Sequence, residues 1–238
     1  TYKEKFSDEI KQYAFNFLRT IHDRLGWDAK KNEPHTNALL RSFAISGLGK
    51  LGDEEILKES KKRFDKFLKN QNSLSADLQE TVFVLVAWNG NESTYKKFMS
   101  LYKTVKSQEQ KLRFLAAMCS FQQKNLLLKT LEFTLGPDVR SQNIQMPIMR
   151  IAANLYGKEF LWGWLKKNWK KIVKKAGIGN PLLNRVVASI GQVVEAKQEK
   201  DVRKFFKQNP LRGTEMTLEQ TMERVRVSSK FLNSIKKE

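Results

Sequence analysis

Helix breakers are almost absent from the middle of this 238-residue chain, because no proline falls between Pro34 and Pro137. Proline removes a backbone donor and clashes with the preceding helical turn, so this interval leaves long segments free to form helices. Apolar residues recur at steps of three and four, which is the period of an amphipathic helix. No alternating pattern of useful length predicts a strand. The sequence therefore predicts an all-α protein.

Short turns separate the predicted helices, and capping residues mark several of the starts. Asp53, Ser75, Ser93 and Ser107 each come just before an apolar-periodic run, as N-caps do. The first helix is predicted to end at Gly26. Its apolar face comprises Phe6, Ile10, Tyr13, Phe17, Ile21 and Leu25. The later helices are predicted over about 34–49, 53–68, 76–88, 93–102, 108–121, 123–135, 147–156, 158–176, 181–191, 195–208 and 215–237.

Helices of this length with tight antiparallel turns favour helix pairs that stack side by side. The expected fold is a superhelical array of antiparallel helix pairs, an αα-superhelix similar to HEAT or armadillo arrays. No exact sequence period is present, so the repeat is one of structure. With 40% hydrophobic residues, the chain can supply a real core. We expect a single helical domain over residues 1–238.

Positive charge dominates the chain, and it is concentrated toward the C-terminal end. The net charge is +19, and residues 158–238 alone carry 19 basic and 8 acidic side chains. Such a region attracts acidic proteins, nucleic acid or anionic surfaces. The more ordinary interpretation is a lysine-rich solvated surface.

Cys119 is the only cysteine, which excludes an internal disulfide and is compatible with a reducing compartment. It lies in the apolar run 112–119, so we expect a buried thiol. No stretch approaches the run of about 18 apolar residues that spans a membrane, and the first residues contain no apolar signal region. We expect a cytoplasmic location and no membrane partner.

Residue patterns for catalysis or metal binding are missing from the sequence. A hydrolytic zinc helix needs two histidines four residues apart with a glutamate between them. The two histidines, His22 and His35, are far apart, and for His35 a role at a helix start or in polar packing is favoured. No phosphate-binding glycine loop and no nucleophile motif is present. The sequence predicts no catalytic residue, no metal ligand and no cofactor in this chain.

Several short motifs nevertheless occur in the order that one enzyme family shows. They begin with Gly26-Trp27-Asp28, Glu33-Pro34-His35 and Ala38-Leu39-Leu40-Arg41, and they continue with Gly49 to Gly52, Leu74 to Leu78, Thr134 to Asp138, Ala152 to Asn154, Trp162, Asn168-Trp169, Phe205-Phe206, Asn209-Pro210 and Gln220 to Arg226. Over about residues 20–232 the chain resembles the C-terminal domain of M1 zinc aminopeptidases. This group includes the puromycin-sensitive and endoplasmic-reticulum aminopeptidases and the archaeal tricorn-interacting factors. Where the last helix of the family has an arginine, an asparagine and a tryptophan, this chain has Met216, Ser228 and Phe231.

The resemblance implies a C-terminal domain that lacks its catalytic region and the zinc bound there. In the family this domain is a bowl of helices over the zinc site, and it receives the body of the peptide during N-terminal trimming. The implied partners are the peptide and the catalytic domain. Within the matched motif, Arg41 and His35 are the candidate substrate-binding residues, although pairing of Arg41 with a carboxylate is the more ordinary role. If the isolated chain self-associates, the apolar surface that packs on the rest of the enzyme is the expected interface.

The segment 160–175 is rich in tryptophan and lysine and allows other functions. As a helix it has an apolar side and a lysine side, which suits either core packing or an anionic membrane surface. A second hypothesis for the whole chain is a helical-repeat scaffold whose basic C-terminal third binds acidic protein or nucleic acid. The aromatic residues occur at core spacing, which argues against nucleic acid.

Overall fold

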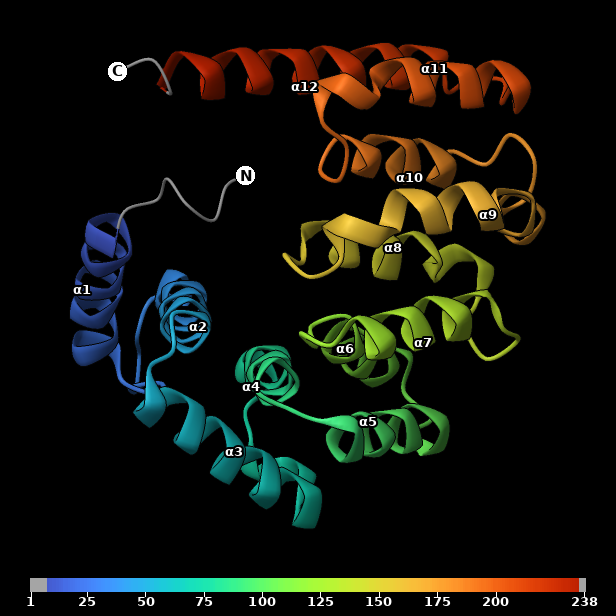
Figure 1. The fold of residues 1–238 in the computed structure, drawn as a ribbon. Helices are drawn as coiled ribbons and strands as arrows, with labels where there is room; N and C mark the ends of the chain where they lie inside the picture. The colour runs from blue at the N-terminus through green and yellow to red at the C-terminus, as the bar shows by residue number, and fades with distance from the viewer. Residues whose placement is uncertain (1–7, 236–238) are drawn as a thin grey trace. The chain divides into compact units, whose positions relative to one another are not determined.

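The computed structural model describes residues 8–235, and in that part it contains twelve α-helices and no strand (Figure 1). The predicted all-α fold is confirmed. The chain divides into two compact units, residues 1–121 and residues 122–238, which are described in turn. No helix within the described residues combines the length and the apolar composition that crossing a bilayer requires.

The first unit contains three helix pairs. Its helices are α1 (Asp8–Leu25), α2 (His35–Lys50), α3 (Glu54–Lys69), α4 (Ala76–Trp88), α5 (Glu92–Thr104) and α6 (Gln108–Met118). Each odd-numbered helix packs on the even-numbered helix that follows it, and α4 packs on both α2 and α6 (Figure 1). The predicted stacking of helix pairs is therefore present in this unit.

Six phenylalanine rings, from four helices and the segment that follows α6, form the centre of this core. Phe83 on α4 is fully buried, with its ring centroid 4.9 Å from that of Phe67 and 5.1 Å from that of Phe114. The cluster comprises Phe64, Phe67, Phe83, Phe98, Phe114 and Phe121. Cys119 is 1% exposed, so the predicted burial of the thiol is confirmed.

Of the four predicted caps, two form the expected side-chain hydrogen bond, and Ser75 directly precedes α4 but forms no such bond. Asp53 accepts a hydrogen bond from the Ile56 amide, and Ser107 accepts one from the Gln110 amide. The expectation that Ser93 opens a helix is wrong. The side chain of Asn91 caps the helix instead by accepting from the Thr94 amide, so α5 begins at Glu92.

Two glycines allow α2 to lie close to both of its neighbours. A Cβ atom added to Gly47 would lie 2.5 Å from a methyl carbon of Leu18 on α1. One added to Gly49 would lie 2.5 Å from a methyl carbon of Leu85 on α4. The close packing of α2 on α1 and on α4 therefore depends on glycine, which has no side chain, at these two positions.

The second unit contains α7 (Lys124–Leu135), α8 (Gln145–Ala153), α9 (Lys158–Ala176), α10 (Leu182–Ile190), α11 (Glu199–Gln208) and α12 (Glu215–Ile235). Helix α10 packs on α8 and on α12. The helix predicted over 195–208 is divided into a 3₁₀ turn, Ala196–Gln198, and α11, because Glu195 and Gln198 form a capping box. The predicted helix end at 237 lies outside the described residues.

The tryptophans of α9 belong to the core of the second unit. Trp162, Trp164 and Trp169 are all buried. The Trp169 ring meets the Phe206 ring edge-to-face with centroids 5.2 Å apart, and the Trp162 indole nitrogen donates to the Asp201 carboxylate at 2.7 Å. This arrangement is the core packing that the sequence left as one of two alternatives.

Candidate functional site

The connection between α1 and α2 contains Gly26-Trp27-Asp28 and Glu33-Pro34, the first of the motifs noted in the sequence. A network of ion pairs holds this connection in place. Trp27 lies at its start, where its ring meets the His22 ring edge-to-face with centroids 6.0 Å apart. The guanidinium carbon of Arg63 on α3 lies 4.8 Å from the centre of the Trp27 ring. This distance is within the range of a cation–π contact.

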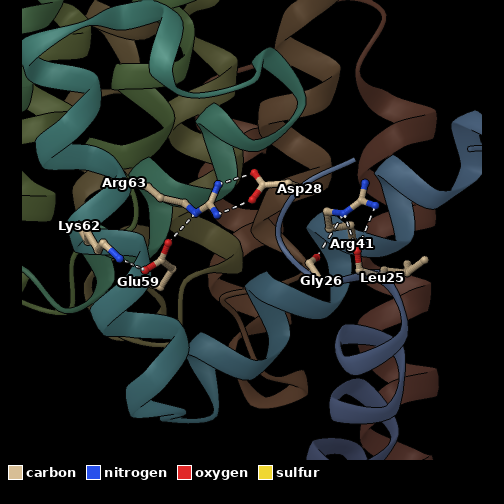
Figure 2. A network of polar contacts seen from close by, with 7 residues as sticks. All are labelled: Leu25, Gly26, Asp28, Arg41, Glu59, Lys62 and Arg63. Atoms are coloured by element: carbon tan, nitrogen blue, oxygen red, sulfur yellow. Dashed lines mark hydrogen bonds and ion pairs between the residues drawn. The ribbon is translucent and has the colours of Figure 1, made fainter. Parts of the chain in front are cut away.

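Arg41 joins the end of α1 to the residues that precede α2. Its two terminal nitrogens donate to the two carboxylate oxygens of Glu33, at 2.8 and 2.7 Å. It also donates to the backbone carbonyl oxygens of Leu25 and Gly26 (Figure 2). The hydrogen bonds from Arg41 hold the pKa of Glu33 below its ordinary value, and those to Glu33 raise the pKa of Arg41. A planar guanidinium suits such a bidentate pair.

A second bidentate pair fixes the same connection to α3. Arg63 donates to both carboxylate oxygens of Asp28, at 2.7 and 2.8 Å, and to Glu59 at 2.9 Å (Figure 2). Lys62 forms an ion pair with Glu59 at 3.3 Å. The hydrogen bonds from Arg63 lower the pKa of Asp28, since they favour its charged form. The two pairs therefore tie the connection between α1 and α2 to α2 through Arg41 and to α3 through Arg63.

The two predicted substrate-binding residues lie in different environments. Arg41 is 2% exposed and fully engaged by Glu33 and backbone carbonyls, which is the geometry of the carboxylate-paired alternative. His35 is exposed at the first position of α2. A direct contact of either residue with substrate stays a prediction.

His35 belongs to an exposed row that we call the α2 stripe: His35, Leu39 and Phe43. Residues four apart lie above one another on a helix. Leu39 is 63% exposed and Phe43 is 62% exposed. Successive residues are about 100° apart around a helix, so Arg41 points nearly opposite to Leu39. The stripe therefore presents an open apolar surface while Arg41 anchors the other side of the helix.

Helix α1 also has an exposed apolar side, formed by Ile10, Tyr13 and Phe17. These side chains are 49%, 75% and 56% exposed, respectively. The predicted apolar face of this helix is therefore buried only toward its C-terminal end, where Leu25 is buried and Ile21 is half-buried. The buried side chains of α1 are Leu18, His22 and Leu25, and Phe6 of the predicted face lies outside the described residues.

The exposed side of α1 points away from the next helix pair. Arg19 forms ion pairs with Asp53 and Glu55 at the beginning of α3. Because Phe17 is two residues before Arg19, it points to nearly the opposite side of α1. We call Ile10, Tyr13 and Phe17 the α1 apolar side; it forms the open end of the stack of helix pairs in the first unit.

In the part of the chain that the structure describes, no group of three His, Cys, Asp or Glu side chains could hold a metal ion. His22 is buried, and burial is the main reason that its pKa lies below the ordinary value. Its Nδ1 atom has no hydrogen-bond partner among the described residues.

Comparison with known proteins identifies the family. The model of the ERAP1-like C-terminal domain matches residues 1–227. The chain belongs to this family. The ERAP1-like domain described here is 29% identical to Aminopeptidase M1-B of Oryza sativa subsp. japonica over 239 residues, which cover 98% of this chain and 27% of that protein.

Other relatives give the same result. Aminopeptidase M1 of Arabidopsis thaliana is 29% identical over 96% of this chain and 26% of its own length. Glutamyl aminopeptidase of Sus scrofa is 28% identical over 94% of this chain and 24% of its own length. The chain thus spans about a quarter of the length of these curated relatives, and it corresponds to the C-terminal domain of M1 aminopeptidases.

Sequence reasoning missed two features of this ERAP1-like domain. Arg63 was not singled out, because its partner Asp28 lies 35 residues away; the only local signal was Glu59, one helical turn before it. The exposure of the α1 apolar side was also missed. Periodicity identifies an apolar side but does not show what covers it.

Proposed function

We propose that this chain is the non-catalytic C-terminal domain of a zinc aminopeptidase, where it encloses the active site and helps to bind the peptide that is trimmed from its N-terminus. The observation that carries the proposal is the exposed α1 apolar side. Zinc and the catalytic residues belong to the catalytic region of the parent enzyme. A cytoplasmic location suits the single buried thiol of Cys119.

The α1 apolar side is the expected contact with the rest of the enzyme. The end of a stacked-helix array needs a polar outer side to remain soluble. Tyr13 and Phe17 instead present more than half of their surface at this end. Exposed apolar surface of this kind marks an interaction site. The catalytic region is the partner in the parent enzyme, and in the isolated chain a second copy is expected to cover the same side.

The α2 stripe is the expected contact with the peptide body. Leu39 and Phe43 can pack against apolar peptide side chains, and His35 can donate or accept a hydrogen bond at the edge. Arg41 acts here as a positioning residue, because it ties the start of α2 to the end of α1. The positive net charge of the domain favours the approach of a peptide carboxylate.

The test compares a short and a long substrate in the full-length parent enzyme. The double variant Leu39→Ser/Phe43→Ser should reduce kcat/KM about tenfold for a peptide of about ten residues, because only a long substrate reaches beyond the catalytic centre. Hydrolysis of a fluorogenic aminoacyl substrate should be unchanged. The isolated chain with added zinc should hydrolyse neither.

The control is Leu155→Ser, which removes a half-exposed leucine from the second unit, where Leu155 is 49% exposed. It should leave both rates unchanged. An equal loss for the short and long substrates in the double variant would contradict peptide binding by the α2 stripe. Hydrolysis by the isolated chain would contradict a non-catalytic role.

A further inference from the structure

A groove in the second unit lies where the last turns of α9 meet the connection between α11 and α12. Its volume is about 400 Å³. It is lined by Trp169, Lys170, Val173, Lys174, Ile178, Asn209, Pro210 and Leu211. None of these positions was a predicted site residue, and the groove plays no part in the proposed function.

The floor and walls of the groove are apolar and well supported. Trp169 is 3% exposed, and its ring is held edge-to-face by Phe205 and Phe206 at centroid distances of 5.8 and 5.2 Å. The Asn209 side chain donates to the Phe205 carbonyl oxygen at 3.0 Å. Ile178, at 88% exposed, stands at the edge. The groove is open to solvent, and its apolar walls can pack against an apolar side chain of a ligand.

The rim of the groove carries positive charge that no described carboxylate neutralises. Lys170 and Lys174 are exposed and one helical turn apart, and neither forms an ion pair with a described residue. Two other lysines of α9 are engaged, since Lys166 pairs with Asp201 at 2.7 Å and Lys175 donates to the Gly136 carbonyl oxygen. No acidic side chain lines the groove. Its potential therefore favours an anionic ligand.

We propose that this groove binds an acidic peptide segment of a partner protein, with an apolar side chain against Val173, Ile178 and Leu211 and flanking carboxylates on Lys170 and Lys174. Apolar floor and basic rim together match such a segment. Stacking of nucleic-acid bases requires exposed rings, whereas the Trp169 ring is buried.

The test measures fluorescence anisotropy of a labelled synthetic peptide in which one phenylalanine is flanked by glutamates and aspartates, at physiological salt and with the full 238-residue chain. Saturable binding is expected. The variant Lys170→Glu/Lys174→Glu should weaken it about tenfold. Replacement of the peptide phenylalanine by alanine should weaken it by a similar factor, because the anchor is lost.

The matched control is Lys167→Glu/Lys171→Glu, which changes the net charge of the same helix equally at exposed positions that do not line the groove. It should weaken binding less than about threefold, since salt screens distant charges. Equal weakening by both double variants would overturn the proposal, because it would mean non-specific attraction. So would binding of phosphatidylserine vesicles or a single-stranded oligonucleotide, but not the peptide, through Lys170 and Lys174.

Discussion

Both units are built from stacked helices, but the second unit has the larger excess of basic side chains. Residues 1–121 carry 21 basic and 15 acidic side chains, whereas residues 122–238 carry 23 and 10. In the first unit, bidentate pairs such as Arg41 with Glu33 fix a connection between helices. The second unit also has a bidentate pair, Arg203 with Glu219, which joins α11 to α12, but its larger excess of basic side chains leaves exposed lysines such as Lys170 and Lys174 without an ion pair to a described residue. Paired charges determine local geometry, and unpaired charges determine which partners are attracted.

The largest expected effect is the loss of stability from core substitutions, which tests whether the two units are stabilised independently. Phe83→Ala should destabilise the first unit by about 3–5 kcal/mol, because it removes the ring at the centre of the phenylalanine cluster. Trp169→Ala should destabilise the second unit, where Phe205 and Phe206 lose their partner. Hydrogen exchange measured by mass spectrometry in increasing urea checks both. If either variant speeds hydrogen exchange equally in both units, the two units unfold together and are not stabilised independently.

An intermediate effect tests the pairing of charges in the first unit. Arg41→Ala should cost about 3 kcal/mol, because it removes a buried partner and leaves Glu33 and two backbone carbonyls unpaired. Urea unfolding followed by circular dichroism measures this change. Arg63→Ala is the control at a more exposed pair, since Asp28 is 77% exposed, and it should cost much less. Equal losses would show that burial of the Arg41 pair is not what matters.

The smallest expected effect is a pH dependence confined to the first unit. Both histidines lie there, and burial lowers the pKa of His22 below its ordinary value of 6.5. The unfolded chain therefore binds a proton before the folded chain does, so stability is complete above pH 6.5 and falls as the pH drops through the lowered pKa. Hydrogen exchange at pH 7 and pH 5.5 should show loosening of the first unit only.

The variant His22→Phe keeps an aromatic ring against Trp27 and removes the titrating group. Its first unit should keep the same protection at both pH values. If the wild-type pH dependence persists in this variant, a titrating group other than His22 is responsible.

Local features of the molecule could be predicted from sequence, and features that join distant segments could not. Helix positions and the caps at Asp53 and Ser107 follow from periodicity and from the residue beside each helix start. The bond from Arg63 to Asp28 joins residues 35 positions apart, and no local pattern indicates it. The groove likewise needs the end of α9 beside residues 209–211. The sequence shows a tryptophan and several lysines there without showing that they border a hollow.

The close approaches at Gly47 and Gly49 have a mechanical consequence. A methyl group at either position must push α2 away from α1 or α4, unless the facing leucine turns aside. Helix α4 also packs on α6, so a displacement at Gly49 that Leu85 does not absorb would reach α6 as well. The two glycines therefore set how closely α2 packs on α1 and on α4. A single added carbon atom there changes this packing without changing any exposed residue.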